Sequence, residues 1–156
     1  MDRYQEHKKK ADKHLQFADH MISVTYDLVQ EPKLLLSALE NVFLAFTNGT
    51  SAILHYKKSI GQVPEFADDF SAKYKLYLTH VEKKHGIDAA YSQAMLEIRD
   101  ILIYRKESPI EFTKDNMLII CSDSYDTRSI SVKQIKRYLA KAKVFIEEIN
   151  KMIPHA

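Results

Sequence analysis

The sequence contains few of the residues that mark several common classes of protein. Its 156 residues include one cysteine, three glycines, four prolines and no tryptophan. A single cysteine, Cys121, cannot form an internal disulfide, which favours a reducing compartment. No apolar run is long enough to span a membrane, and residues 1–14 are too polar for a secretory signal. We therefore expect a cytoplasmic protein that does not contact a membrane.

The shortage of glycine also excludes the common phosphate-binding loops. Gly49, Gly61 and Gly86 are far apart, so the chain has neither a Walker A loop nor a dinucleotide-binding fingerprint. It has no nucleophile elbow, and Cys121 lies in an apolar run where a buried, inert thiol is expected. The one Glu-x-x-His motif, at residues 82–85, supplies only part of a di-iron ligand set. We expect no catalytic residue, no metal site and no cofactor.

The overall composition indicates one folded domain spanning residues 1–156. Apolar residues make up 46% of the chain, which is too many for a disordered protein. A chain of this length buries roughly 68–70% of its unfolded surface without disulfides or metals. The net charge of +2 is spread over both signs, so it does not by itself demand a nucleic acid or an anionic membrane.

Residues 32–60 carry the clearest helical pattern. Their apolar side chains recur at spacings of four and three, at Leu35, Leu39, Val42, Phe46, Ile53, Tyr56 and Ile60. Further apolar side chains fill the other faces of the first half, so several neighbours must cover this helix. Phe46 and Ile53 are seven residues apart, so the pattern continues across Gly49 without a slip. We predict one continuous central helix and a cost of about 1 kcal/mol for the interior glycine.

Other helices are predicted around the central one. Their expected ranges are 2–29, 68–85, 88–107 and 131–152. The first of them has two adjacent apolar rows. One runs through Ala11, Leu15, Ala18, Ile22, Thr25 and Val29, and the other through Phe17, Met21, Val24 and Leu28. Ser131 is followed three residues later by Gln134, which is typical of a helix start. The expected fold is all-α, an up-and-down bundle of four or five helices.

Residues 109–131 break the helical period between the last two helices. Residues 117–121 form a short apolar run rich in β-forming residues, and residues 122–126 are rich in turn formers. Residues 128–131 then alternate between polar and apolar side chains. We predict a small antiparallel β-hairpin inserted at about 109–131. Because two strands are marginally stable alone, the hairpin should pack on the bundle or on a partner.

Arginine is scarce, and two of the five arginines share one predicted helix. Arg99 and Arg105 lie in the range 88–107 together with Asp100 and Tyr104. A planar guanidinium with five donors suits phosphate recognition, which makes these four residues the candidate binding site. The alternative is an ordinary surface ion pair, worth about 0–1 kcal/mol. The lysine run at residues 8–10 is interrupted by acidic neighbours and is interpreted as a solvated helix face.

Four segments of the chain resemble small archaeal uncharacterised helical proteins that are similar to the HEPN superfamily (higher eukaryotes and prokaryotes nucleotide-binding). The segments are KADKHLQFADHMI, LLLSALENVFLAFTN, SPIEFTKDN and SVKQIKRYLAKAKVFIEEI. The likeness covers most of the chain but consists mainly of core patterns, so it informs on fold more than on chemistry. It implies a bundle of four or five helices, often dimeric, in a family that includes ribonuclease toxins and nucleotide-binding partners.

The sequence departs from that family at its catalytic motif. Active HEPN ribonucleases carry an arginine followed, after four to six residues, by a histidine. The best match here begins at Arg99, and Tyr104 stands in the histidine position. Arg3 and His7 are one residue too close together to match. A tyrosine with a pKa near 10 is a poor general base at neutral pH, whereas an imidazole near 6.5 is a good one.

The function expected from the sequence is therefore that of a non-catalytic binding or regulatory module. It would contact a nucleotide, an RNA or a protein partner, such as a nucleotidyltransferase, through Arg99, Asp100, Tyr104 and Arg105. The competing hypotheses are a ribonuclease with a remodelled active site and a purely structural protein-interaction module. Wide apolar stripes and nine tyrosines also predict a homodimer. The sequence does not identify the ligand.

Overall fold

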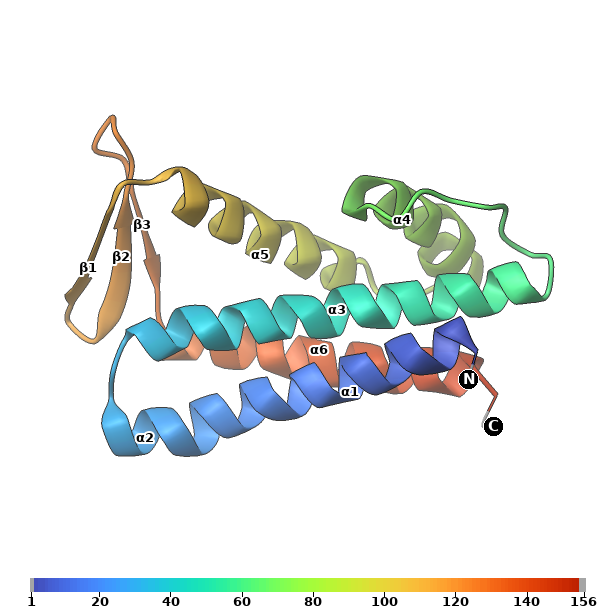
Figure 1. Ribbon diagram of the computed structural model, residues 1–156, viewed down its shortest axis with the longest axis horizontal. Helices are drawn as coiled ribbons and strands as arrows, with labels where there is room; N and C mark the ends of the chain where they lie inside the picture. Colours follow the sequence, from blue (N-terminus) through green and yellow to red (C-terminus); the bar gives the residue numbers. More distant parts are fainter. Residues whose placement is uncertain (1, 155–156) are drawn as a thin grey trace.

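The computed structural model describes residues 2–154, and its helices run along one long axis with a small sheet at one end (Figure 1). Helix α3 (Lys33–Ser59) is central. On one side it packs against α1 (Arg3–His20) and α6 (Val132–Met152), and on the other against α4 (Phe70–Tyr77) and α5 (Ala89–Glu107). The predicted mostly helical architecture is confirmed.

Helix α3 is continuous, as its apolar spacing predicted. Leu35, Leu39, Phe46 and Ile53 are all completely buried, and the helix runs through Gly49 without a break. Gly49 is itself buried, because the Phe145 ring of α6 lies directly against it. The glycine that lowers helix propensity therefore permits the close approach of a neighbouring helix.

The first predicted helix contains a π-helical segment, η1 (Met21–Thr25), followed by a short α2 (Tyr26–Val29). The wider turn shifts the helix face, so that Ile22 and then Tyr26 continue the buried row. The second apolar row was expected to widen the buried stripe, and that expectation was wrong for Phe17, Val24 and Leu28. These three side chains are 51%, 43% and 81% exposed, and Val29, expected in the first row, is 62% exposed. A second π-helical segment, η2 (Leu78–Lys83), follows α4.

Three helices begin at residues whose side chains cap them. Asp69 accepts a hydrogen bond from the backbone N–H of Ala72 at the start of α4, and Asp88 caps α5 in the same way. Ser131 accepts a hydrogen bond from the N–H of Gln134 over 3.2 Å, which confirms the predicted start of α6. Each cap satisfies a donor that the first helical turn leaves free, worth about 1 kcal/mol.

The predicted hairpin is a three-stranded antiparallel sheet, so the expectation of two strands was wrong. Its order is β1 (Ile110–Lys114), β2 (Met117–Cys121) and β3 (Thr127–Ile130). Strand β1 was missed because its alternation of apolar and polar residues extends over only five residues, all of them exposed. Leu118, Ile120 and Ile130 are completely buried, which anchors one face of the sheet on the bundle.

Candidate functional site

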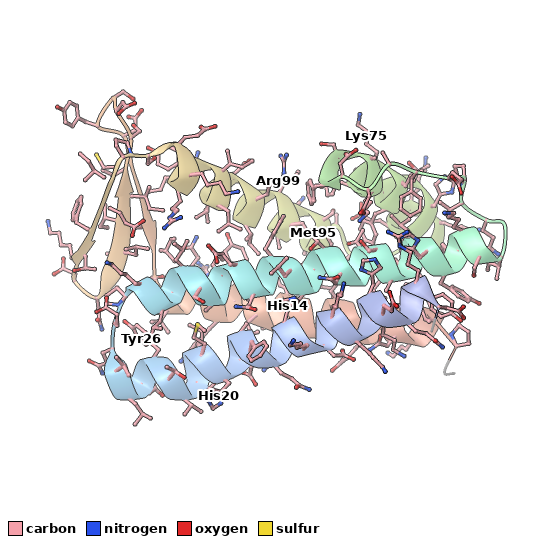
Figure 2. All side chains as sticks on the ribbon, in the orientation of Figure 1. His14, His20, Tyr26, Lys75, Met95 and Arg99 are labelled. Carbon is pink, nitrogen blue, oxygen red and sulfur yellow. The ribbon has the colours of Figure 1, made fainter. Side chains whose placement is uncertain are left out.

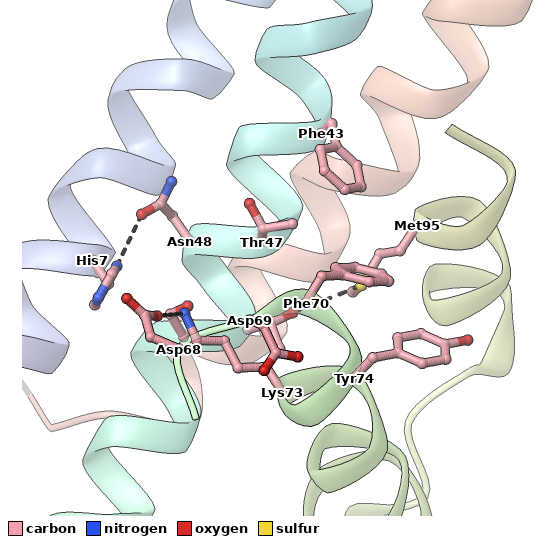
Figure 3. A pocket seen from close by; sticks show the side chains of 12 residues that line it. His7, Phe43, Thr47, Asn48, Asp68, Asp69, Phe70, Lys73, Tyr74 and Met95 are labelled. Atoms are coloured by element: carbon pink, nitrogen blue, oxygen red, sulfur yellow. Dashed lines mark hydrogen bonds and ion pairs between the residues drawn. The ribbon is translucent and has the colours of Figure 1, made fainter. Parts of the chain in front are cut away.

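Two neighbouring cavities lie beside the middle of α3. The first, here called the aromatic cavity, has a volume of about 350 Å³ and lies between α1, α3, α4 and α5 (Figure 3). The second, here called the arginine cavity, has a volume of about 390 Å³ and lies between α3 and the second half of α5. Phe43 of α3 lines both cavities. The two cavities, which share this residue, are the candidate site and are here called the groove.

Three aromatic side chains, Phe43, Phe70 and Tyr74, line the aromatic cavity and are here called the aromatic wall. Phe70 is the first residue of α4, where the Asp69 cap fixes the helix start. Its ring is stacked on Tyr74, with the ring centroids 5.4 Å apart, and lies 5.7 Å from the Phe43 ring. The Tyr74 hydroxyl donates to the Ser92 carbonyl of α5 over 3.1 Å, which ties α4 to α5. The wall is therefore held on several sides; all three of its rings line the aromatic cavity, and Phe43 alone also lines the arginine cavity.

His7 of α1 lines the aromatic cavity and has a defined tautomer. The amide nitrogen of Asn48 donates to the Leu44 carbonyl over 2.8 Å, so the Asn48 oxygen is free to accept. That oxygen lies 2.9 Å from His7 Nδ1, which must then carry the proton (Figure 3). Nε2 is left with a lone pair. Burial, more than the nearby cations, lowers the pKa of His7 and favours this neutral form.

His55 stacks behind His7 and is still harder to protonate. The two rings are 5.2 Å apart and nearly parallel, and Phe66 packs 5.0 Å from His55. Burial lowers the pKa of His55 to about 4, and the charges of His7, Arg3, Lys73 and Lys58 act in the same direction. His55 Nε2 has no hydrogen-bond partner among the described residues, which fits a neutral ring.

Lys73 lines the aromatic cavity together with His7, and Asp68 compensates the positive charge of Lys73. The Lys73 ammonium contacts the Asp68 carboxylate, which also lies 4.0 Å from the Arg3 guanidinium. The hydrogen bond from Lys73 and its charge lower the pKa of Asp68. Asp68 is largely exposed, so an anionic ligand could displace its side chain from Lys73 at little cost.

Arg99 connects the two cavities. It projects from α5 and lines the arginine cavity, while its guanidinium lies 4.9 Å from the centroid of the Phe70 ring (Figure 2). Among residues 2–154, no carboxylate forms an ion pair with it, although Glu40 lines the same cavity. The ring contact holds the guanidinium without using its N–H donors, which leaves them available to a ligand.

The four residues predicted from the sequence do not form one cluster. Arg99 and Arg105 line the arginine cavity together, and Arg105 Nε donates to Glu111 of β1 over 3.2 Å. Tyr104 points toward the sheet instead, where its hydroxyl donates to the Asp126 carbonyl over 2.6 Å and its ring lies under Arg128. Asp100 is exposed and lines neither cavity. The structure thus groups only the two arginines.

Several site residues were missed because their partners are distant in the sequence. His7, Phe70 and Lys73 come from two helices that were treated separately. One signal was available for His7: histidines at 7 and 14 match asparagines at 48 and 41, each pair seven residues apart. His14 Nδ1 lies 2.9 Å from Asn41 Oδ1, and the Asn41 amide nitrogen donates to the Ser37 carbonyl, which repeats the His7 arrangement. These pairs fix the antiparallel register of α1 on α3.

The Glu-x-x-His motif lies outside the groove. Glu82 accepts a hydrogen bond from Ser92 over 2.5 Å, and His85 is exposed. Within the part of the chain that the structure describes, no three side chains of the metal-binding types are close enough to share an ion. Among residues 2–154, no helix has both the length and the apolar composition needed to cross a bilayer.

Comparison of the chain with models of protein families, with curated proteins and with solved structures finds no match. A function must therefore be argued from the groove itself.

Proposed function

We propose that the protein is a non-catalytic module that binds a nucleotide or a short single-stranded RNA segment in the groove. The single observation that carries this proposal is Arg99, whose guanidinium rests on an aromatic ring and has no carboxylate partner among the described residues. The proposal keeps the two arginines of the sequence-based site and replaces Tyr104 and Asp100 by the aromatic wall. It also keeps the HEPN-like character, the homodimer and the cytoplasmic location expected from the sequence.

The groove combines the two features that sequence-tolerant binding of single strands requires. Bases stack on exposed aromatic faces, which contributes about 1–3 kcal/mol per base, and cations follow the phosphate backbone. Phe43, Phe70 and Tyr74 supply the aromatic faces of the aromatic cavity. Arg99, Arg105 and Lys106 supply the charge of the arginine cavity. A nucleotide would place its base on the wall and its phosphate beside Arg99.

The absence of catalysis is proposed from the position of Tyr104. Its hydroxyl donates to the Asp126 carbonyl and its ring lies under Arg128, so it faces the sheet rather than the arginine cavity. A general base must reach the proton that it removes, and a side chain turned away from the groove does not. Without that base, Arg99 can hold a phosphate but has no partner to cleave it.

Binding can be tested by fluorescence anisotropy with a short labelled oligoribonucleotide. Arg99→Ala should weaken binding about tenfold or more, because a hydrogen bond to a charged group is worth about 1.5–3 kcal/mol. The plot of log K against log salt should lose about 0.7 of its slope for each phosphate contact removed. The matched control is Arg137→Ala, which removes an exposed arginine of α6 that lines neither cavity. Equal losses in both variants would contradict a specific site.

A second candidate function is a ribonuclease with a remodelled site. It is favoured by one observation: His7 lines the aromatic cavity and its Nδ1 faces the Asn48 oxygen, which leaves a lone pair on Nε2 whenever the ring is neutral. Incubation with single-stranded RNA in the presence of a chelator separates the two functions. Cleavage that disappears in His7→Asn would replace our proposal by the ribonuclease. Binding without cleavage, lost in Arg99→Ala, would support it, and no RNA binding at all would leave the protein-interaction module.

A further inference from the structure

Strand β1 has one free edge and lies farthest from the helices (Figure 1). It pairs with β2 on one side only, and all five of its residues are exposed. An edge strand presents unpaired backbone donors and acceptors, which another strand can use. Phe112, at the middle of the strand, is 43% exposed.

The register of the hairpin shows which backbone groups are free. Lys114 is paired with Met117 across a two-residue turn, Asp115 and Asn116, whose φ angles are +50° and +64°. Residues that flank such a turn exchange both backbone hydrogen bonds, and the pattern repeats every second residue along the strand. Lys114, Phe112 and Ile110 therefore bond to β2. The N–H and C=O groups of Glu111 and Thr113 face outward.

We propose that β1 of a second copy of this chain docks antiparallel on this edge, with a two-fold axis at Phe112. The two three-stranded sheets then form one continuous six-stranded sheet. Glu111 of each copy faces Thr113 of the other, which satisfies all four free groups on each strand. Phe112 faces Phe112 of the second copy. Glu111 of this interface accepts a hydrogen bond from Arg105 of the arginine cavity, but none of the β1 residues lines the groove itself.

Charge selects this register over its neighbours. A shift that centres the axis on Glu111 places two carboxylates directly opposite each other, which is unfavourable. A shift that centres it on Thr113 places Glu111 opposite Asp115, with the same result. With the axis at Phe112, Lys114 faces Ile110 of the second copy and no like charges are opposed. We therefore take the partner to be a second copy of this chain, because the free backbone groups of Glu111 and Thr113 lie symmetrically about Phe112.

The outer face of the sheet gives the dimer an apolar contribution. Ile110 and Phe112 are paired with Cys121 and Ile119, so these side chains share the face turned away from the bundle. Ile110 and Phe112 are 47% and 43% exposed in the single chain. When the two sheets join edge to edge, these side chains of the two copies lie side by side and cover part of each other's surface. The two Phe112 rings become direct cross-strand neighbours.

Light scattering of the purified protein, with proline variants at the two sheet edges, tests the interface. Thr113→Pro removes an outward N–H from β1 without touching the β1–β2 ladder, so it should convert a dimer of two 18.1 kDa chains into a monomer. The matched control is Ser129→Pro, because Ser129 is exposed on β3 and its N–H faces outward at the opposite edge. It should remain dimeric. A monomeric parent protein at micromolar concentration, or dimers in both variants, would overturn the proposal.

Cysteine cross-linking tests the axis directly and does not depend on the folding of a proline variant. In a Cys121→Ser background, Phe112→Cys should form an intermolecular disulfide, because opposed residues at this position lie about 4.5 Å apart between Cα atoms. Thr113→Cys should not, since the two copies of residue 113 lie off the axis and beyond disulfide reach. Cross-linking that is equal at both positions, or absent at Phe112→Cys, would contradict the two-fold at Phe112.

Discussion

Gly49 offers a direct test of how α3 packs on α6. A Cβ atom added at Gly49 would lie 2.9 Å from Cε2 of Phe145, closer than real Cβ contacts allow. The Phe145 ring is completely buried and packs against Phe46, Tyr77 and Tyr91, with centroids 5.3–5.8 Å away. It therefore has little room to move aside. Overpacking of a tight core costs about 1–3 kcal/mol.

The opposing effect is helix propensity, which favours alanine over glycine by about 1 kcal/mol. Gly49→Ala should therefore lower the free energy of unfolding by about 1 kcal/mol, the difference of the two effects. Urea denaturation followed by circular dichroism measures it, and the melting temperature should fall by about 2–4 °C per kcal/mol. In a Phe145→Leu background, Gly49→Ala should cost less, because the smaller side chain leaves space for the methyl group.

A matched substitution separates propensity from packing. Ala140 is exposed on α6, so Ala140→Gly reports propensity alone and should cost about 1 kcal/mol. If Gly49→Ala instead stabilised the protein by a similar amount, the close contact between Gly49 and Phe145 would be refuted.

Other predictions concern the core, a helix cap and pH. Phe46→Ala should lower the free energy of unfolding by about 3–5 kcal/mol in urea denaturation, because the side chain is completely buried. A loss below about 1 kcal/mol would contradict the placement of Phe46 in the core. Asp69→Ala should lower the free energy of unfolding by about 1 kcal/mol, because the cap of α4 is lost. The same substitution should weaken RNA binding, because Phe70 is then held less firmly. Unchanged binding would show that the cap does not contribute to the site. His55 has a folded-state pKa of about 4 against 6.5 when unfolded, so the unfolded chain binds more protons between these values. Stability should therefore fall as pH drops through this window, and less so in His55→Leu.

The sequence predicted the helices well because their apolar spacing records burial directly. Phe46 and Ile53 lie on one face of α3 and both are completely buried, which is why the phase across Gly49 could be trusted. The same method failed at η1, because a fixed period of 3.6 residues cannot register a π-helical turn. After such a turn the buried face moves by one residue, so Tyr26 is buried where Thr25 was expected.

The site was less predictable because it depends on contacts between distant segments. Arg99 and Arg105 were predicted as site residues from their residue type, their shared helix and the motif resemblance at Arg99. The contact between Arg99 and Phe70 requires knowing that the first turn of α4 lies against α5, and no local pattern in the sequence carries that information. Tyr104 was assigned to the same site because it is close to the two arginines in the sequence. Its hydroxyl instead donates a hydrogen bond to the backbone carbonyl of Asp126, twenty-two residues along the chain.

The short helix α4 links the local structure to the proposed function. Its first residue, Phe70, lies directly after the Asp69 cap, so the cap sets the position of the ring as well as the start of the helix. The ring in turn contacts the Arg99 guanidinium from one face, and no carboxylate among the described residues forms an ion pair with it. A guanidinium that is oriented before its ligand arrives loses less side-chain entropy on binding than a free one. The groove therefore owes its proposed affinity for phosphate to a helix cap and an aromatic ring as much as to the charge itself.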